Sequence, residues 1–459
     1  MKVLLVFPRE PEDIEAGGKD YPLGILYIAS YLKENDIDCE VFDMTFSNWK
    51  KYERKIKETK PDIIGFSIFT PIASSGFRSI KIAKKLSPKS KIIVGGVHAC
   101  VDTDKVIRNK DVDIVVLGEG ERTFLEIVNT IEKNKSLKNI KGIVFKQSGK
   151  IIKNKPSERI ENLDSLPFPD RAFVDIEKYL KSSLEMTMIT ARGCPFNCVY
   201  CQPTQRKVFG NTIRRRSPEN VIKEMKWLIS KHAELGNKKY RFYFVDDTFT
   251  YDKKWLKHFC KHVKRLDIEW SISTRVDMID SETIKVLKKS GCISINFGVE
   301  SGSQRILNDV MKKGITVDQI RKAFYLCHKY RMIANAFIMI GSPTETKEDL
   351  DDTINLISQI HPDSIQVSIT TPMIGSRLFE ICQKDGISNI RKIDDYDYCK
   401  NDYPIKLENL TKEDLKHYKR KILKTWKWNM IKNIPKYLSL LTSNDSKTQF
   451  KMMIRPFTK

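Results

Sequence analysis

The first 145 residues alternate short apolar runs with stretches of helical periodicity. Apolar runs of strand length occur at residues 3–7, 39–42, 63–69, 92–94 and 114–117. The segments between them are long enough for crossover helices, and one helix is expected at residues 24–35. Strands that alternate with helices in this way are typical of a parallel sheet covered on both faces. We therefore predict a doubly wound, Rossmann- or flavodoxin-like α/β domain at residues 1–145.

The second half of the chain shows the same alternation. Further strands are expected at residues 186–190, 241–245, 270–273, 293–298, 334–340 and 364–369. Helical segments separate most of them, so six βα units are predicted, as in an open (β/α)6 relative of the eightfold TIM barrel. We place this partial barrel at residues 181–385, after a polar β-ribbon and linker at 146–180. A small, mostly helical region is expected at 386–459.

The chain is strongly basic, with a formal net charge of +23. The excess of Lys and Arg is spread along the chain, which favours a solvated lysine-rich surface over a polyanion site, so no nucleic-acid partner is expected. Residues 411–459 are the exception, with 13 Lys or Arg against three acidic residues. A helix packed on the main body is expected there, with weak membrane-surface contact as the alternative, because apolar residues recur every three or four positions. These residues are Leu415, Tyr418, Ile422, Trp426 and Met430.

The location of the protein is predicted from what the sequence lacks. It contains no run of about 20 apolar residues that could span a bilayer. The apolar start at residues 1–7 is followed by Pro8, Arg9 and Glu10, which is too early for a signal peptide. We therefore expect a cytoplasmic protein whose ten cysteines bind metal or are buried as free thiols.

Three cysteines lie within eight residues, directly after the first strand of the second half. They are Cys194, Cys198 and Cys201, and Gly193 precedes them. A 4Fe-4S cluster held by three thiolates on one loop keeps one iron open for a small molecule. Structural zinc commonly takes four ligands in two pairs, and no second pair is placed to match. The spacing favours a cluster, with zinc and inert buried thiols as the alternatives.

The pattern Cys-x3-Cys-x2-Cys, with Tyr200 just before its last cysteine, resembles the signature of the radical S-adenosylmethionine superfamily. In that superfamily the three cysteines hold a 4Fe-4S cluster, whose open iron chelates S-adenosylmethionine before its cleavage to a 5′-deoxyadenosyl radical. The resemblance implies the same catalytic and metal-binding role for Cys194, Cys198 and Cys201. It also implies S-adenosylmethionine contacts from Tyr200, Asp246, Asp247, Arg275, Glu300, Ser301, Gly341 and Glu345.

Several of these residues also suit a purely structural role. Asp246 and Asp247 would receive the methionine ammonium group, but they could equally cap a helix. Arg275 suits a carboxylate or an ordinary surface ion pair. Gly341 and Glu345 could form a turn in which Glu345 caps the next helix. For Glu300 and Ser301 the resemblance implies contact with the ribose hydroxyls.

The glycine motifs of the first half resemble those of the cobalamin-binding domain in one branch of this superfamily. Two of them, residues 95–98 and 118–121, follow predicted strands at the edge where doubly wound sheets bind ligands. The sequence lacks an Asp-x-His-x-x-Gly run, so His98 is not assigned as a cobalt ligand. The corrin contacts that the resemblance implies are Ser67, Thr70, Gly95, Gly96, Gly118 and Glu119.

Taken together, the two resemblances imply an enzyme with a 4Fe-4S cluster, S-adenosylmethionine and cobalamin as cofactors. We expect methyl transfer to an unactivated carbon, with radical cyclisation or another oxidoreduction as the alternative. A non-catalytic redox or corrinoid sensor is the alternative from another class. The expected partners are a small-molecule or peptide substrate and an electron donor such as flavodoxin or ferredoxin.

Overall fold

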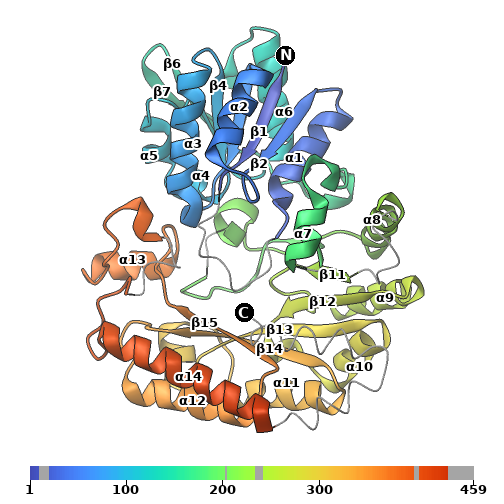
Figure 1. Ribbon diagram of the computed structural model, residues 1–459, viewed down its shortest axis with the longest axis vertical. Coiled ribbons are helices and arrows are strands. Elements are labelled where there is room, and N and C mark those ends of the chain that lie inside the picture. Colours follow the sequence, from blue (N-terminus) through green and yellow to red (C-terminus); the bar gives the residue numbers. More distant parts are fainter. Residues whose placement is uncertain (10–19, 184, 202–203, 233–240, 397–402, 433–459) are drawn as a thin grey trace.

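The computed structural model describes residues 1–9, 20–183, 185–201, 204–232, 241–396 and 403–432. An amino-terminal α/β unit, blue to cyan in Figure 1, lies above a second α/β unit coloured yellow to red. The carboxyl-terminal helix lies along the outside of the lower unit.

The first sheet has seven strands in the order β2-β1-β3-β4-β5-β6-β7. Strands β1 to β5 are parallel. The order reverses between β1 and β3, and ligands of doubly wound sheets bind outside the carboxyl ends of the strands at this kind of position. The strands are β1 (Val3–Phe7), β2 (Cys39–Asp43), β3 (Ile63–Ser67), β4 (Lys91–Gly95), β5 (Ile114–Val116), β6 (Ile143–Gln147) and β7 (Lys150–Lys153).

Helices cover both faces of this sheet, which confirms the predicted doubly wound fold. On one face α1 and α6 bury Leu32 and Ile127 against the strands. On the other face α2, α3 and α5 bury Tyr52, Ile80 and Val106. The helices are α1 (Leu23–Glu34), α2 (Trp49–Thr59), α3 (Ala73–Leu86), α4 (Val97–Val101), α5 (Thr103–Arg108) and α6 (Gly120–Glu132).

The predicted β-ribbon exists, but it starts earlier than expected and is part of the first sheet. Its strands β6 and β7 pair antiparallel with each other, and β6 pairs antiparallel with β5. The ribbon therefore covers the backbone edge that β5 would otherwise leave unpaired. Residue 143, not 146, is where the ribbon begins.

The second sheet contains six parallel strands in the order β15-β14-β13-β12-β11-β8, which confirms the partial barrel. The strands are β8 (Met186–Met188), β11 (Arg241–Phe244), β12 (Glu269–Thr274), β13 (Cys292–Glu300), β14 (Ile333–Ile340) and β15 (Ser364–Ile369). The helices of this half are α7 (Ile176–Ser183), α8 (Pro218–Lys231), α9 (Lys253–Val263), α10 (Ser281–Lys289), α11 (Val317–Lys329), α12 (Lys347–Ile360) and α13 (Arg377–Lys384). A two-stranded ribbon, β9 (Ala191–Arg192) with β10 (Arg214–Arg215), and a π-helix (Thr204–Phe209) follow β8.

Helix α14 (Lys412–Lys432), the last helix of the described residues, packs on the barrel as predicted and lies beside α12 in Figure 1. The rest of the predicted helical region, residues 433–459, lies outside the described residues. The apolar positions that recur along α14 are buried. The indole nitrogen of Trp426 also donates a hydrogen bond to the carbonyl of Pro362 at 3.0 Å. Among the described helices, none combines the length and the apolar character needed to cross a membrane.

Candidate active site

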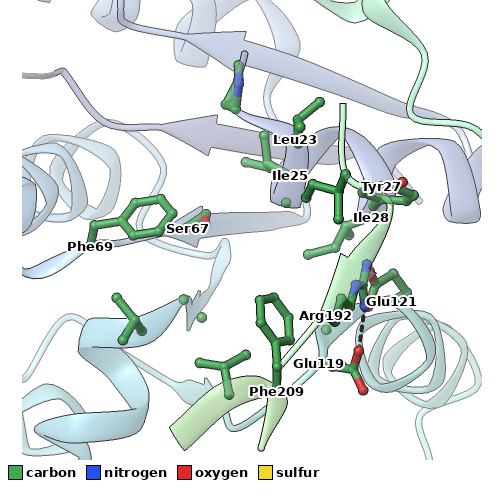
Figure 2. A pocket seen from close by; sticks show the side chains of 18 of the residues that line it. Leu23, Ile25, Tyr27, Ile28, Ser67, Phe69, Glu119, Glu121, Arg192 and Phe209 are labelled. Carbon is green, nitrogen blue, oxygen red and sulfur yellow. Dashed lines mark hydrogen bonds and ion pairs between the residues drawn. The ribbon is translucent and has the colours of Figure 1, made fainter. Parts of the chain in front are cut away.

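A cavity of about 590 Å³ lies where the two sheets face each other, within the size range of cofactor sites. Strand ends of the first sheet supply one side of it, including Ser67, Gly95 and Gly118. The barrel supplies the other side, including Gly193 and Asp247. Figure 2 shows aromatic and aliphatic side chains around this cavity. Phe69 comes from the segment after β3 of the first sheet, and Phe209 comes from the end of the π-helix. The cavity therefore joins the ligand edges of both sheets.

The loop that carries the three cysteines is fixed by its backbone. Val199 donates to the carbonyl of Met311 and accepts from the amide of Leu378, both at 2.9 Å. Gly193 has φ +92°, and a Cβ at this position would lie 2.1 Å from the carbonyl oxygen of Thr212. Only glycine fits there, so the residue before Cys194 is set both by its dihedral angle and by close backbone approach.

We expect Gly193→Ala to remove most of the iron that the protein retains after anaerobic cluster assembly. The added methyl group must displace the Thr212 backbone, and a non-glycine residue at positive φ costs a further 1–3 kcal/mol or so. Gly149→Ala is the matched control, because Gly149 has φ +75° but no atom within 4 Å of the added Cβ. Iron content per chain measures the effect, and equal iron in the two variants would contradict this account of the loop.

The three thiols are close enough to affect one another's ionisation. Burial, followed by the charges of Asp247 and Cys198, raises the pKa of Cys194. Burial, followed by the charges of Asp247, Cys198 and Cys194, raises the pKa of Cys201 to about 12. Without a positive centre the thiols therefore oppose one another's ionisation. Metal ions remove this obstacle, because a coordinated thiol is deprotonated.

Tyr200 and Glu300 form a buried hydrogen-bonded group with Lys313. The Tyr200 hydroxyl donates to Glu300 Oε1 at 3.0 Å, and Lys313 Nζ donates to both, at 3.0 Å and 2.6 Å. Burial, followed by the Glu300 charge, raises the pKa of Tyr200 well above its ordinary value. The structure thus brings two of the predicted S-adenosylmethionine contacts together beside the cysteine loop.

Arg275 lies against the same loop but is engaged by a neighbouring carboxylate. Its guanidinium makes two hydrogen bonds to Asp277, at 3.0 Å and 2.9 Å. It also stacks 3.8 Å from the ring centre of Phe196 and approaches Cys198 Sγ to 3.9 Å. An ion pair is therefore present, as the sequence allowed, but Arg275 is buried and lies next to a cysteine rather than on the surface.

Asp246 and Asp247 both line the cavity, and the contacts of Asp246 show its role. Asp246 accepts hydrogen bonds from the amides of Thr190 and Ala191, at 3.0 Å and 2.5 Å, and from the Thr190 hydroxyl at 2.9 Å. It therefore fastens the chain just before the cysteine loop rather than capping a helix. The next helix is capped by Asp252, whose side chain accepts from the amides of Lys254 and Trp255.

Of the predicted S-adenosylmethionine contacts, only Asp246 and Asp247 are among the residues that line the cavity. The others do not line it: Tyr200, Arg275, Glu300, Ser301, Gly341 and Glu345. The Ser301 hydroxyl is fully buried, 3.3 Å from Thr353 Oγ1 in α12. Glu345 accepts from the amides of Gly341 and Ser342, at 2.5 Å and 2.9 Å.

The alternative role considered for Glu345, a cap of the following helix, is not the one that the structure shows. The residue that caps α12 is Thr346, which forms a capping box with Asp349. The carboxylate of Glu345 instead folds back to the turn after β14, where two amides need an acceptor.

Glu345 predicts a pH-dependent stability. Burial outweighs its two backbone hydrogen bonds and raises the pKa of this carboxyl from 4.5 to about 8. Between these values the folded protein holds a proton that the unfolded chain releases, so the free energy of unfolding falls as the pH rises from about 5 to 8. Glu345→Gln should flatten this decline, and urea unfolding of the anaerobic protein at both pH values measures it. An unchanged slope would contradict the assignment.

Only some of the predicted corrin contacts lie at the cavity. Ser67, Gly95, Gly96 and Gly118 line the cavity. Thr70 does not; its hydroxyl is buried 3.3 Å from His98 Nδ1, and His98 is buried too.

Glu119 lines the cavity, but its carboxylate already has charged partners. It accepts from Arg192 Nη1 at 2.6 Å and from Arg214 Nη1 at 2.7 Å. Sequence reasoning missed both arginines. The chain offers no local signal for such a contact, because 73 residues separate Glu119 from Arg192.

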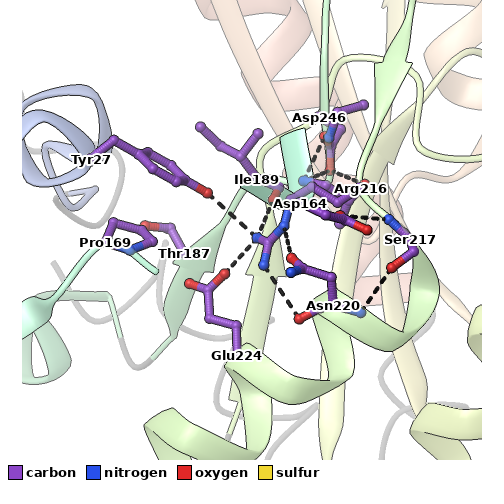
Figure 3. A network of polar contacts seen from close by, with 12 residues as sticks. Tyr27, Asp164, Pro169, Thr187, Ile189, Arg216, Ser217, Asn220, Glu224 and Asp246 are labelled. Carbon is purple, nitrogen blue, oxygen red and sulfur yellow. Dashed lines mark hydrogen bonds and ion pairs between the residues drawn. The ribbon is translucent and has the colours of Figure 1, made fainter. Parts of the chain in front are cut away.

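A second buried ionic network joins the barrel to the amino-terminal unit (Figure 3). Glu224 of α8 pairs with Arg171 at 2.8 Å and with Arg216. Arg216 also donates to the carbonyl of Ile189 at 3.0 Å and to the Tyr27 hydroxyl at 3.4 Å. This network therefore links α1, α8 and the end of β8.

Comparison with known families agrees with both halves of the site. The Radical SAM superfamily matches residues 188–357, and the B12 binding domain matches residues 13–128. An uncharacterised methyltransferase from Pyrococcus horikoshii is 35% identical, over 92% of this chain and 91% of the relative. An anaerobic magnesium-protoporphyrin IX monomethyl ester cyclase from Rubrivivax gelatinosus is 28% identical, over 83% of this chain and 70% of the relative.

Solved structures share the fold. The cobalamin-dependent S-adenosylmethionine radical enzyme OxsB, with aqua-cobalamin and S-adenosylmethionine bound, matches with a TM-score of 0.74 and 17% identity, over all of this chain and 75% of that one. The methyltransferase TsrM from Kitasatospora setae, with cobalamin and a [4Fe-4S] cluster bound, matches with a TM-score of 0.69 and 17% identity, over 83% and 75%. From the cysteine loop, the two domain matches and the 35% identical relative, we conclude that the chain is an enzyme of the radical S-adenosylmethionine family whose members carry a cobalamin-binding domain.

Proposed function

We propose that the protein transfers a methyl group to an unactivated carbon, with a 4Fe-4S cluster, S-adenosylmethionine and cobalamin as its cofactors. One observation carries this proposal: a single cavity joins the glycine-lined edge of the first sheet to Gly193 and Asp247 beside the cysteine loop. An enzyme that uses cobalamin and S-adenosylmethionine together needs these two edges to meet. The 35% identical relative is itself named a methyltransferase.

The cysteine loop fits a cluster better than it fits free thiols. Cys194, Cys198 and Cys201 would hold the irons, and the positive charge of the irons would let the thiols ionise. When bound, the cluster supplies the electron that breaks the sulfonium bond of S-adenosylmethionine. Glu300 and Lys313 hold the Tyr200 side chain in place.

The lining of the cavity is compatible with cobalamin. At Gly95 the nearest atom to an added Cβ is the Val116 Cβ at 3.8 Å, so the cavity has open space beside this strand end. Phe7, Phe69 and Phe209 give the walls aromatic character, which excludes water from a reactive centre. When bound, cobalamin supplies a carrier for the methyl group. Among the described residues that line the cavity there is no His, Cys, Met or Lys, so none of these side chains is placed there as a ligand for cobalt.

Radical cyclisation is a second candidate. The relative from Rubrivivax gelatinosus at 28% identity favours it, because that protein is named a cyclase. The substrate is proposed to be a small molecule or a peptide, and the electron donor a flavodoxin or ferredoxin. A reducing cytoplasm suits these partners and the free cysteines among the described residues.

Cobalamin retention tests the proposal. Protein with its cluster assembled anaerobically is mixed with hydroxocobalamin and desalted, and the absorbance spectrum is expected to show about one corrin per chain. Gly95→Phe should reduce this retention, because a Cβ fits at Gly95 and the added ring takes up space beside the cavity. Wild-type protein that retains no corrin would remove the cobalamin assignment.

A further inference from the structure

Four buried charges join the two halves of the protein beside the cavity. The Glu119 carboxylate accepts from Arg192 Nη1 at 2.6 Å and from Arg214 Nη1 at 2.7 Å. The other terminal nitrogen of Arg192 donates to Glu121 Oε1 at 2.5 Å. None of the four side chains is more than 5% exposed. Figure 2 shows the Arg192 side chain directed at the two glutamates.

On the barrel side, these charges are fastened to the cysteine loop. Arg192 lies two residues before Cys194 in the sequence. Its backbone is opposite that of Arg214 in the antiparallel β9–β10 ribbon. The next residue, Gly193, lies so close to the ribbon that an added Cβ would come within 2.1 Å of the Thr212 carbonyl oxygen. A shift of the Arg192 side chain therefore passes to the backbone that carries the first cluster ligand.

On the amino-terminal side, the same charges are fastened to the cavity wall. Gly118, Glu119 and Gly120 line the cavity in one turn between β5 and α6. Glu119 also accepts from the Ile160 amide at 2.9 Å, so its carboxylate has little freedom. A ligand that presses on this turn and a cluster on the cysteine loop therefore act on the same carboxylate.

We propose that Glu119 and Arg192 are positioning residues that couple ligand binding in the cavity to cluster binding on the cysteine loop. Cobalamin then binds more tightly when the cluster is in place, and by thermodynamic reciprocity the cluster is held more tightly when cobalamin is bound. The inference rests on the proposed function, because it takes cobalamin and the cluster as the two ligands.

The coupling is measured as a ratio of dissociation constants. Binding of hydroxocobalamin is followed by equilibrium dialysis with protein before and after anaerobic cluster assembly. Wild-type protein should bind at least about five-fold more tightly with the cluster, the lower end of ordinary coupling between sites. Glu119→Gln should bring the ratio close to one.

A second variant keeps the test usable if Glu119→Gln fails to fold. Arg192→Lys retains the positive charge but has one ammonium group in place of a fork that reaches two carboxylates, so it should also lower the ratio. The matched control is Glu269→Gln. It removes a charge from the buried Arg241–Glu269 pair, 3.1 Å apart, at the amino-terminal ends of β11 and β12, and should keep the wild-type ratio.

Each outcome decides the matter. A wild-type ratio of one, in protein that binds cobalamin and cleaves S-adenosylmethionine, overturns the coupling and leaves the proposed function standing. A wild-type ratio in both Glu119→Gln and Arg192→Lys shows that these residues do not carry the coupling. A ratio equally lost in Glu269→Gln makes the effect a general loss of stability. Protein that binds no cobalamin overturns the proposed function and the coupling together.

Discussion

Replacing Cys198 with alanine is expected to abolish the broad absorbance near 400 nm and to reduce iron from about four atoms per chain to almost none. The reason is that three thiolates are the minimum for a cluster that keeps one iron open, and this loop supplies no other thiol. Release of 5′-deoxyadenosine should fall below detection, because the electron that cleaves S-adenosylmethionine comes through the cluster. Iron analysis and the absorbance spectrum of anaerobically reconstituted protein make the measurement.

The matched control is Cys260→Ala. Cys260 lies in the hydrophobic core of the barrel, where burial raises the pKa of its thiol to about 12. A buried free cysteine behaves as a small apolar side chain, so the replacement of Cys260 by alanine should leave the iron content unchanged. Iron retained by Cys198→Ala at the wild-type level would sink the assignment, whereas iron lost from Cys260→Ala would indicate a second metal centre.

Glu224→Ala should lower the free energy of unfolding by about 3–5 kcal/mol, the largest stability effect that we predict. Glu224 is 1% exposed and pairs with Arg171, which is fully buried, and with Arg216. Its removal leaves two buried guanidinium groups without a carboxylate. Because Arg216 also reaches Ile189 and Tyr27, the loss should loosen the contact between α1 and the barrel.

Urea unfolding measures this effect, and Glu177→Ala provides the comparison. Glu177 pairs with Lys181 at 3.3 Å one turn along α7, but both side chains are more than half exposed. Exposed pairs of this kind contribute little, so no measurable change is expected. Equal stability of the two variants would mean that the buried network is not important for folding.

The fold was largely predictable because each strand is encoded by a local apolar run. Both β1 and β15 have the predicted bounds, and every other predicted strand is present within a few residues. Pairing partners are not encoded locally, however. A ribbon and linker were expected at residues 146–180 from their polar pattern, and the ribbon lies at 143–153. Nothing within it indicated that β5 would be its neighbour.

The site was predictable where a short motif carries the chemistry and unpredictable where distant charges meet. The three cysteines lie together because eight residues contain all of them. Arg192 and Glu119 meet only through tertiary folding, so neither could be recognised as the other's partner. Thr346 is a different case. Its capping box with Asp349 follows a familiar spacing, and sequence reasoning chose the adjacent Glu345 instead.

The most direct test of the central claim is the release of 5′-deoxyadenosine. Protein reconstituted anaerobically with iron, sulfide and hydroxocobalamin is given S-adenosylmethionine and a low-potential reductant, and the products are separated by liquid chromatography. We predict 5′-deoxyadenosine from the wild-type protein and none from Cys198→Ala. A wild-type protein with an intact cluster and a competent reductant that releases no 5′-deoxyadenosine would contradict the account.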